Sequence, residues 1–186
     1  IKFIITNSMQ KNKNRYNKYI ELKELNVSDV SKEYVEWLND FETVKYTEQR
    51  YKKNSRKDIE NYVKNIKLSK ISFLYGIYLK NNNRDLHVGN IKLGPINFNH
   101  KSSYISYLIG NKSFKNQGIA TQSIYLIINL AKKKFKLKKL FAGIYSINEA
   151  SKKVLLKNKF KCEGKLRSSI VFKNKRYDSL IYGKIL

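Results

Sequence analysis

Residues 105–121 read ISYLIGNKSFKNQGIAT, and this stretch decides the fold. Its aromatic and β-branched residues predict a strand over Tyr104–Ile109. From Gly118 onward apolar residues recur at helical spacing, which predicts a helix to about Lys134. The residues that define this spacing are Ile124, Ile127, Ile128, Ala131 and Phe135. The stretch is therefore interpreted as a strand, a loop and a helix.

The loop Lys115–Ala120 has the composition of an anion-binding site at a helix N-terminus. Gly118 and Ala120 are small, so a ligand can approach the backbone there. The first amides of a helix lack intrahelical partners and attract negative charge, and Lys115 adds a cation beside them. From these residues alone, a phosphate site and an ordinary tight turn both remain open.

The elements around this stretch alternate between strands and helices. An N-cap at Ser28 predicts a helix to about Leu38, with Trp37 as a core anchor, and a capping box at Ser55–Asp58 begins a helix to about Ile66. Further strands are expected over Tyr19–Leu25, Ile71–Lys80, His87–Leu93, Leu140–Ser146, Lys161–Phe172 and Arg176–Ile185, with a helix over Asn148–Asn158. This order predicts a mixed α/β (α+β) sheet with an antiparallel front and a strand–helix–strand unit behind it.

Composition limits the class of protein. The chain has 186 residues, 41% of them hydrophobic, which is enough for one core, so we expect one domain over 18–186 and a flexible polar tail over 1–17. The formal charge of +25 invites a nucleic-acid interpretation, but the lysines are scattered along every segment, as codon bias would produce. A positive surface would also attract an anionic ligand such as CoA.

The cysteine count, the possible metal ligands and the apolar runs limit the compartment and the kinds of site. Cys162 is the single cysteine, so no internal disulfide and no cysteine zinc cage is possible, and a reducing cytoplasm fits best. The two histidines and the scattered carboxylates have no metal-ligand spacing, so no metal is predicted. No apolar run approaches the roughly 20 residues of a membrane span. Met9 is the only methionine, and whether residues 1–8 are native is left open.

Two motifs resemble those of the GNAT acetyltransferases. The run Lys115-Asn116-Gln117-Gly118-Ile119-Ala120 after the strand is similar to that family's Arg/Gln-x-x-Gly-x-Gly/Ala motif. Downstream, Asn148-Glu149-Ala150-Ser151, with the helix that ends before Phe160, is similar to the family's Asn-x-x-Ser helix. The resemblance covers roughly residues 19–186 and is nearest to the branch of ribosomal-protein and amino-sugar N-acetyltransferases. It implies a mostly antiparallel sheet of about seven strands flanked by about four helices.

The resemblance also implies a site for acetyl-CoA as co-substrate. Backbone groups of Leu108, Ile109 and Gly110 would align the pantetheine arm, and one amide would stabilise the oxyanion. Amides of Asn116, Gln117, Gly118, Ile119, Ala120 and Thr121 would hold the pyrophosphate beside Lys115, and Asn148 and Ser151 would help to position the cofactor. Lys115 replaces the usual Arg or Gln, Lys159 replaces a Gly before Phe160, and Leu155 replaces a frequent Tyr that protonates the thiolate.

The residues for acid–base catalysis are less defined. An attacking amine must be neutral, so a base or a water relay is expected. Tyr104 occupies the position of a carboxylate common in the family, which leaves Glu48, His100 and His87 as candidate bases. Glu48 and Arg50 lie in the segment where relatives build the acceptor pocket, and both are candidate substrate-binding residues.

Three functional hypotheses remain at this point. The leading one is direct acetyl transfer in a ternary complex to a primary amine of a small molecule, with a nucleotide-linked amino sugar ahead of a protein N-terminus. The second is a basic nucleic-acid- or ribosome-binding protein, and the third is a GNAT-like domain that binds CoA without catalysis. No membrane partner is expected, and a homodimer is left open.

Overall fold

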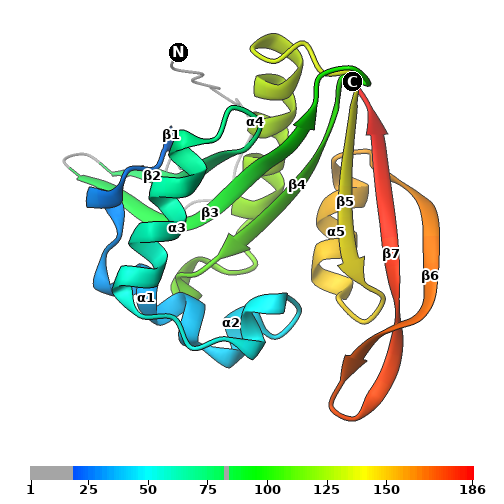
Figure 1. Ribbon diagram of the computed structural model, residues 1–186, viewed down its shortest axis with the longest axis horizontal. Helices are drawn as coiled ribbons and strands as arrows, with labels where there is room; N and C mark the ends of the chain where they lie inside the picture. The colour runs from blue at the N-terminus through cyan, green and yellow to red at the C-terminus, as the bar shows by residue number, and fades with distance from the viewer. Residues whose placement is uncertain (1–18, 82–83) are drawn as a thin grey trace, which may run out of the picture.

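The computed structural model describes residues 19–81 and 84–186, which form a seven-stranded sheet with helices on both faces (Figure 1). The expected tail at 1–17 and the question of residues 1–8 lie outside the described residues. The elements follow in the order β1 (Tyr19–Glu24), η1 (Val27–Asp29), α1 (Lys32–Asn39), α2 (Phe41–Val44), η2 (Glu48–Tyr51), α3 (Arg56–Leu68), β2 (Phe73–Asn81), β3 (Arg84–Asn97), β4 (Ser102–Ile109), η3 (Lys112–Phe114), α4 (Ile119–Lys133), β5 (Lys139–Tyr145), α5 (Glu149–Lys157), β6 (Lys161–Phe172) and β7 (Lys175–Ile185).

The sheet has the strand order β1-β2-β3-β4-β5-β7-β6, and only β4 and β5 pair in parallel. This confirms the predicted mixed, mostly antiparallel sheet. The described chain has five α-helices, one more than expected, because Phe41–Val44 forms a short helix between the first two expected helices. The Asp40 side chain caps this helix by accepting a hydrogen bond from the Thr43 amide at 3.0 Å.

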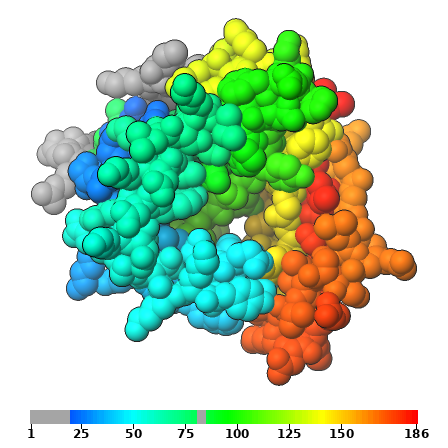
Figure 2. Space-filling view, viewed as in Figure 1, coloured from blue at the N-terminus to red at the C-terminus, as the bar shows by residue number. Residues whose placement is uncertain are grey.

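The sheet opens between β4 and β5. These strands pair only through Ser102–Tyr104 and Lys139–Phe141, and the next residues of β4 have no partner in β5. Figure 1 shows the two strands diverging from this point, and Figure 2 shows a hollow in the same region of the surface. The second half of β4 therefore presents one unpaired strand edge, whose amides and carbonyls are available to a ligand.

Two hydrophobic clusters fix the helices on opposite faces. The larger cluster packs α4 and α5 against the sheet, and Ile124, Ile127 and Ala131 are fully buried in it, as their spacing predicted. Burial of one such isoleucine contributes about 1.5–3 kcal/mol. The smaller cluster packs α1 and α3 on the other face around Trp37, which is the predicted core anchor.

One of the two predicted helix N-caps is confirmed, and the other is wrong. The box predicted at Ser55 is present: the Ser55 hydroxyl accepts from the Asp58 amide, and the Asp58 carboxylate accepts from the Ser55 amide at 2.8 Å. Ser28 was predicted to cap the first helix, and this is wrong. Ser28 lies inside the 3-10 turn η1, and α1 instead begins after Ser31, whose hydroxyl accepts from the Tyr34 amide at 3.2 Å.

The β6–β7 turn and the end of α5 both contain residues that have positive φ but are not glycine. Lys173 and Asn174, at φ 49° and 60°, form the turn of the β6–β7 hairpin, which joins the strands expected over Lys161–Phe172 and Arg176–Ile185. A two-residue loop of this kind requires both φ values to be positive. Lys159 has φ 62° after α5, where the Phe160 amide donates to the Leu155 carbonyl at 3.1 Å. Lys159 therefore keeps the turn that glycine usually makes.

We predict that Lys159→Gly raises the free energy of unfolding by about 1 kcal/mol, because it removes the steric cost of a left-handed lysine. Lys157→Gly is the matched control, since Lys157 lies inside α5. It should lower the free energy of unfolding by about 0.5–1 kcal/mol. Urea denaturation of both variants measures the difference, and a loss of stability for Lys159→Gly would contradict the prediction.

Candidate active site

The loop that enters α4 is shaped for an anion by its backbone. Asn116 has φ 61° and Gly118 has φ 79°. A Cβ on Gly118 would meet nothing within 4 Å, so the chain needs glycine there for its conformation and not for space inside the protein. Within the described residues, the amides of Gly118, Ile119, Ala120 and Thr121 donate no hydrogen bond, whereas the Gln122 amide donates to the Gly118 carbonyl. Four successive donors are thus available at the positive end of a helix.

Lys115 supplies the cation expected beside this loop. Its Nζ donates to the Thr43 hydroxyl at 3.2 Å, which ties the side chain to α2. Burial lowers the pKa of Lys115 from its ordinary value, because the ammonium group loses water. A bound phosphate would reverse this effect by favouring the charged form.

The open edge of β4 provides a second set of backbone groups. The Gly110 amide donates to the Val88 carbonyl of β3 at 3.0 Å, so it is already engaged. Successive residues of a strand direct their amides to opposite edges, and the Ile109 amide therefore faces the opening towards β5. Among the three residues Leu108–Gly110, Ile109 is the one placed to donate to a ligand in the opening.

Gly110 has a packing role at the end of this edge. A Cβ there would lie 2.0 Å from the Trp37 ring, so the close approach of Trp37 requires glycine. Asn148 also has a structural contact, since its Oδ1 accepts from the Ser151 amide at 3.1 Å and caps α5. The Asn148–Ser151 motif thus sets the start of α5, on the face of the sheet that also carries α4.

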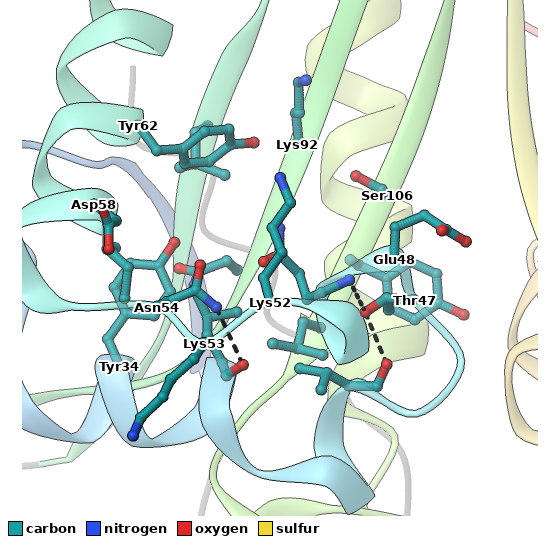
Figure 3. Close-up of a pocket in the computed structure, with 18 residues that line it drawn as sticks. Tyr34, Thr47, Glu48, Lys52, Lys53, Asn54, Asp58, Tyr62, Lys92 and Ser106 are labelled. Atoms are coloured by element: carbon teal, nitrogen blue, oxygen red, sulfur yellow. Dashed lines mark hydrogen bonds between the residues drawn. The ribbon is translucent and has the colours of Figure 1, made fainter.

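A cavity of 690 Å³ lies on the opposite face of the same strands. Figure 3 shows its lining, which comes from α1, α3, η2 and the segment after it, and strands β2–β4. Lys52, Lys53 and Lys92 line it, and none of them forms an ion pair within the described part of the chain. Figure 3 shows Lys52 and Lys92 extending in one direction and Lys53 pointing the other way. The cavity is therefore cationic on one side.

Glu48 lines this cavity and also contacts β5, the strand on the other side of the opening. It lines the cavity from η2, and its carboxylate accepts a hydrogen bond from the Tyr145 hydroxyl at the end of β5. Burial, together with this bond, raises the pKa of Tyr145 to about 12, so the phenol stays protonated and donates to Glu48. The Glu48 carboxylate is thus fixed to the end of β5 and lines a cavity that residues of β4 also line.

Arg50 is anchored beside this pair. Its guanidinium lies 4.8 Å from the centre of the Tyr145 ring and donates to the Lys45 carbonyl at 3.0 Å and the Val171 carbonyl at 2.9 Å. The residue ties η2 to the β6–β7 hairpin. These contacts give Arg50 a structural role, and its role in binding substrate stays a prediction.

The other candidate residues lie elsewhere. His100 is exposed in the β3–β4 turn, and Tyr104 is 48% exposed with its ring 5.3 Å from that of Phe141; neither lines the cavity. His87 is packed among aromatic rings, and burial lowers its pKa. Leu155, which replaces the tyrosine that is frequent in the resembled family, is fully buried in the core. The structure thus brings together Glu48, Arg50 and the β4 edge, and separates them from His100.

Sequence reasoning missed four residues of this site: Tyr145, Lys52, Lys92 and Asn90. The contact between Glu48 and Tyr145 joins residues far apart in the chain, and no local pattern encodes it. A signal did exist for Asn90 and Lys92, because they interrupt an apolar strand with polar side chains on one face.

Within the described residues, the sheet thus opens beside a loop of unpaired amides and has a cavity on its other face, which gives the strand β4 a place for a ligand on each side. Residues 20–161 match the family model described as the acetyltransferase (GNAT) domain. The chain therefore belongs to the GNAT acetyltransferase family, and it is an acetyl-CoA-dependent N-acetyltransferase. No curated protein is significantly similar to this sequence.

Solved structures of acetyltransferases share the fold. The microcin C7 self-immunity acetyltransferase MccE, in complex with acetyl-CoA and AMP, is 20% identical with a TM-score of 0.77, over 92% of this chain and 94% of that chain. The ribosomal L7/L12 α-N-protein acetyltransferase RimL, with coenzyme A, is 20% identical with a TM-score of 0.76, over 90% and 94%. Spermidine N-acetyltransferase from Vibrio cholerae, with CoA and spermine, is 15% identical with a TM-score of 0.78, over 89% and 95%.

Two further properties concern the described residues alone. No helix among them is both long and apolar enough to cross a membrane. They also contain no group of three or more histidine, cysteine or acidic side chains placed to hold a metal ion.

Proposed function

We propose that the protein acetylates the primary amine of a small acceptor that carries an anionic group, bound in the 690 Å³ cavity. The observation that carries this proposal is the charge of the lining. Lys52 and Lys92 have no acidic partner within the described residues, whereas the two lining carboxylates are engaged, Glu48 by Tyr145 and Asp58 by Ser55. The cavity therefore favours an anionic acceptor and disfavours a polyamine.

Acetyl-CoA would bind on the other side of β4. The amides of residues 118–121 and the Lys115 ammonium would hold the pyrophosphate, and the β4 edge would align the pantetheine arm. The Ile109 amide, which faces the opening, would donate to the oxyanion that develops from the thioester carbonyl. Both substrates would meet at Glu48, where the cavity and the opening adjoin.

Glu48 is the base of this proposal. An alkyl amine has a pKa near about 10, so the bound acceptor must lose a proton before its nitrogen attacks. The Glu48 carboxylate takes this proton and releases it to water. The neutral nitrogen then attacks the thioester carbonyl, and the carbon–sulfur bond breaks as the oxyanion collapses. The nitrogen gives its second proton to water, and the CoA thiolate takes a proton from solvent. His100 and Tyr104 lie outside the cavity lining and take no part in this step.

Within this class we favour a nucleotide-linked amino sugar over a protein N-terminus. A diphosphate offers charge to Lys52 and Lys92, and a cavity of this volume suits a small molecule better than an extended chain. The similar structure of MccE was solved with AMP beside acetyl-CoA, which agrees with a nucleotide as part of the acceptor.

The test is CoA-thiol release with purified protein, acetyl-CoA and a matched set of amines. We expect a nucleotide-linked amino sugar to have a kcat/KM at least about tenfold above that of the free amino sugar and of spermidine. A preference for spermidine, or for N-terminal peptides, would contradict the proposal. Lack of turnover with every amine would contradict the activity itself.

The role of the cavity lysines can be isolated with one pair of variants. Lys92→Gln should raise the KM for the anionic acceptor about tenfold, because it removes a charged partner, and leave the KM for acetyl-CoA unchanged. Lys53→Gln is the matched control, since this side chain points away from Lys92 (Figure 3). If both substitutions raise the acceptor KM equally, the acceptor responds to the overall positive charge of the cavity and not to a specific contact with Lys92.

A further inference from the structure

Asn90 is a buried polar residue whose amide nitrogen has no partner. The residue is 6% exposed in the middle of β3, and its Nδ2 forms no hydrogen bond within the described chain. Asn90 lines the cavity and pairs across the sheet with Leu108, which also lines it. Buried donors in native proteins almost always have partners, so an unpaired donor on a cavity wall indicates a missing hydrogen-bond acceptor.

His87 determines which end of the Asn90 amide is unpaired. The His87 Nε2 lies 2.9 Å from the Gly89 carbonyl and 2.9 Å from the Asn90 Oδ1. Because a carbonyl can only accept, Nε2 must carry the proton, and the Asn90 atom beside it must be the oxygen. The opposite end of the amide is then the NH₂ group, with two hydrogens to donate.

A β-bulge makes this pair possible. The register pairs Ile77 with Gly89 and Tyr78 with His87, so Val88 is the extra residue. Without the bulge, His87 and Asn90 would lie on opposite faces of the sheet, because they are three positions apart in the strand. The bulge places both side chains on the cavity face. Gly76, opposite Asn90, leaves space for the histidine, since a Cβ there would lie 3.2 Å from the His87 Nε2.

We propose that the Asn90 amide determines acceptor specificity by donating a hydrogen bond to an oxygen atom of the anionic acceptor, and that His87 positions this amide. The inference rests on the proposed function and names one of its recognition contacts. Lys92 is two residues along the same strand and therefore on the same face, so an acidic oxygen would meet the amide donor next to a cation.

Asn90→Asp is the sharpest test. Aspartate keeps the oxygen that accepts from His87 but replaces the donor by a second oxygen, which repels an anion. We expect the KM for the anionic acceptor to rise about tenfold or more, with kcat less affected and the KM for acetyl-CoA unchanged. Asn97→Asp is the matched control, because it makes the same change in β3 and keeps the oxygen that accepts from the His100 amide. It should change neither KM.

The positioning role of His87 requires its own variants. His87→Phe keeps an aromatic ring but removes the Nε2 hydrogen, so the amide loses its orientation and the acceptor KM rises. His87→Gln restores a side-chain amide donor near the same place and should recover part of the loss. If Asn90→Asp does not fold, Asn90→Ser removes the amide and carries the same expectation.

The outcomes separate this inference from the proposed function. If wild-type protein acetylates no anionic amine, the proposed function fails. If the wild-type protein does acetylate an anionic amine, the two Asn90 variants decide the inference. A wild-type acceptor KM in both Asn90→Asp and Asn90→Ser would overturn the Asn90 contact alone. Two results would overturn the positioning role of His87. One is a His87→Phe variant that loses kcat but keeps the wild-type acceptor KM. The other is a His87→Gln variant whose acceptor KM is as high as that of His87→Phe.

Discussion

Glu48→Gln lowers the kcat of acetyl transfer by about 10²- to 10⁴-fold, the usual range for loss of a general base. Glutamine keeps the shape of the side chain and an oxygen that can accept from Tyr145, so the cavity should persist. It cannot take a proton from the acceptor amine. The Kd of acetyl-CoA should not change, because the loop proposed to bind the phosphates lies at the start of α4 and not in η2.

Stopped-flow thiol release with saturating acceptor measures this effect. Glu42→Gln is the matched control, because Glu42 is an exposed carboxylate of α2 that pairs with Lys45 at 2.7 Å; its kcat should equal that of the wild type. Tyr145→Phe removes the hydrogen bond to Glu48 but keeps the carboxylate, so a smaller loss, about tenfold, is expected. A Glu48→Gln enzyme with wild-type kcat would show that the base is a different group or water.

Asn116→Asp raises the Kd of acetyl-CoA by about 10- to 100-fold, because it places a negative charge beside the expected pyrophosphate. The substitution is nearly isosteric, and aspartate tolerates the positive φ of residue 116 as asparagine does. A negative charge near a helix N-terminus is favourable, so the free protein should gain up to about 1 kcal/mol of stability. Weaker binding together with unchanged or greater stability is a result that misfolding cannot produce.

Calorimetric titration with acetyl-CoA checks this prediction. Asn129→Asp adds the same charge near the other end of α4 and should leave the affinity unchanged. The defect in Asn116→Asp should shrink as salt is raised, because salt screens the repulsion. Equal affinities of the two variants would show that the loop does not bind the phosphates.

Most of the fold could be predicted because its signals are local. The apolar spacing of α4, the Ser55 capping box and the β6–β7 hairpin each depend on residues close in sequence, and the structure contains all three. The N-cap at Ser28 was wrong because Ser28 and Ser31 both stand shortly before the apolar residues of the helix. The chain forms the 3-10 turn Val27–Asp29 first, and α1 begins after Ser31.

The site was predicted less completely because it depends on distant contacts. The small residues Gly118 and Ala120 predicted a phosphate-binding loop, and this role stays a prediction. Tyr145 meets Glu48 only because the sheet opens between β4 and β5, and Asn90 meets His87 only because of the bulge at Val88. Neither the opening of the sheet nor the bulge leaves a periodic pattern in the sequence. These two contacts therefore became visible only in the three-dimensional structure.

The central claim is that both substrates occupy the site together and meet at Glu48. Initial velocities measured over a grid of acetyl-CoA and acceptor concentrations test it most directly. Direct transfer in a ternary complex predicts double-reciprocal lines that intersect, and no acetyl group on the protein after incubation with acetyl-CoA alone. Parallel lines, together with an acetylated protein, would contradict the claim and indicate a covalent intermediate instead.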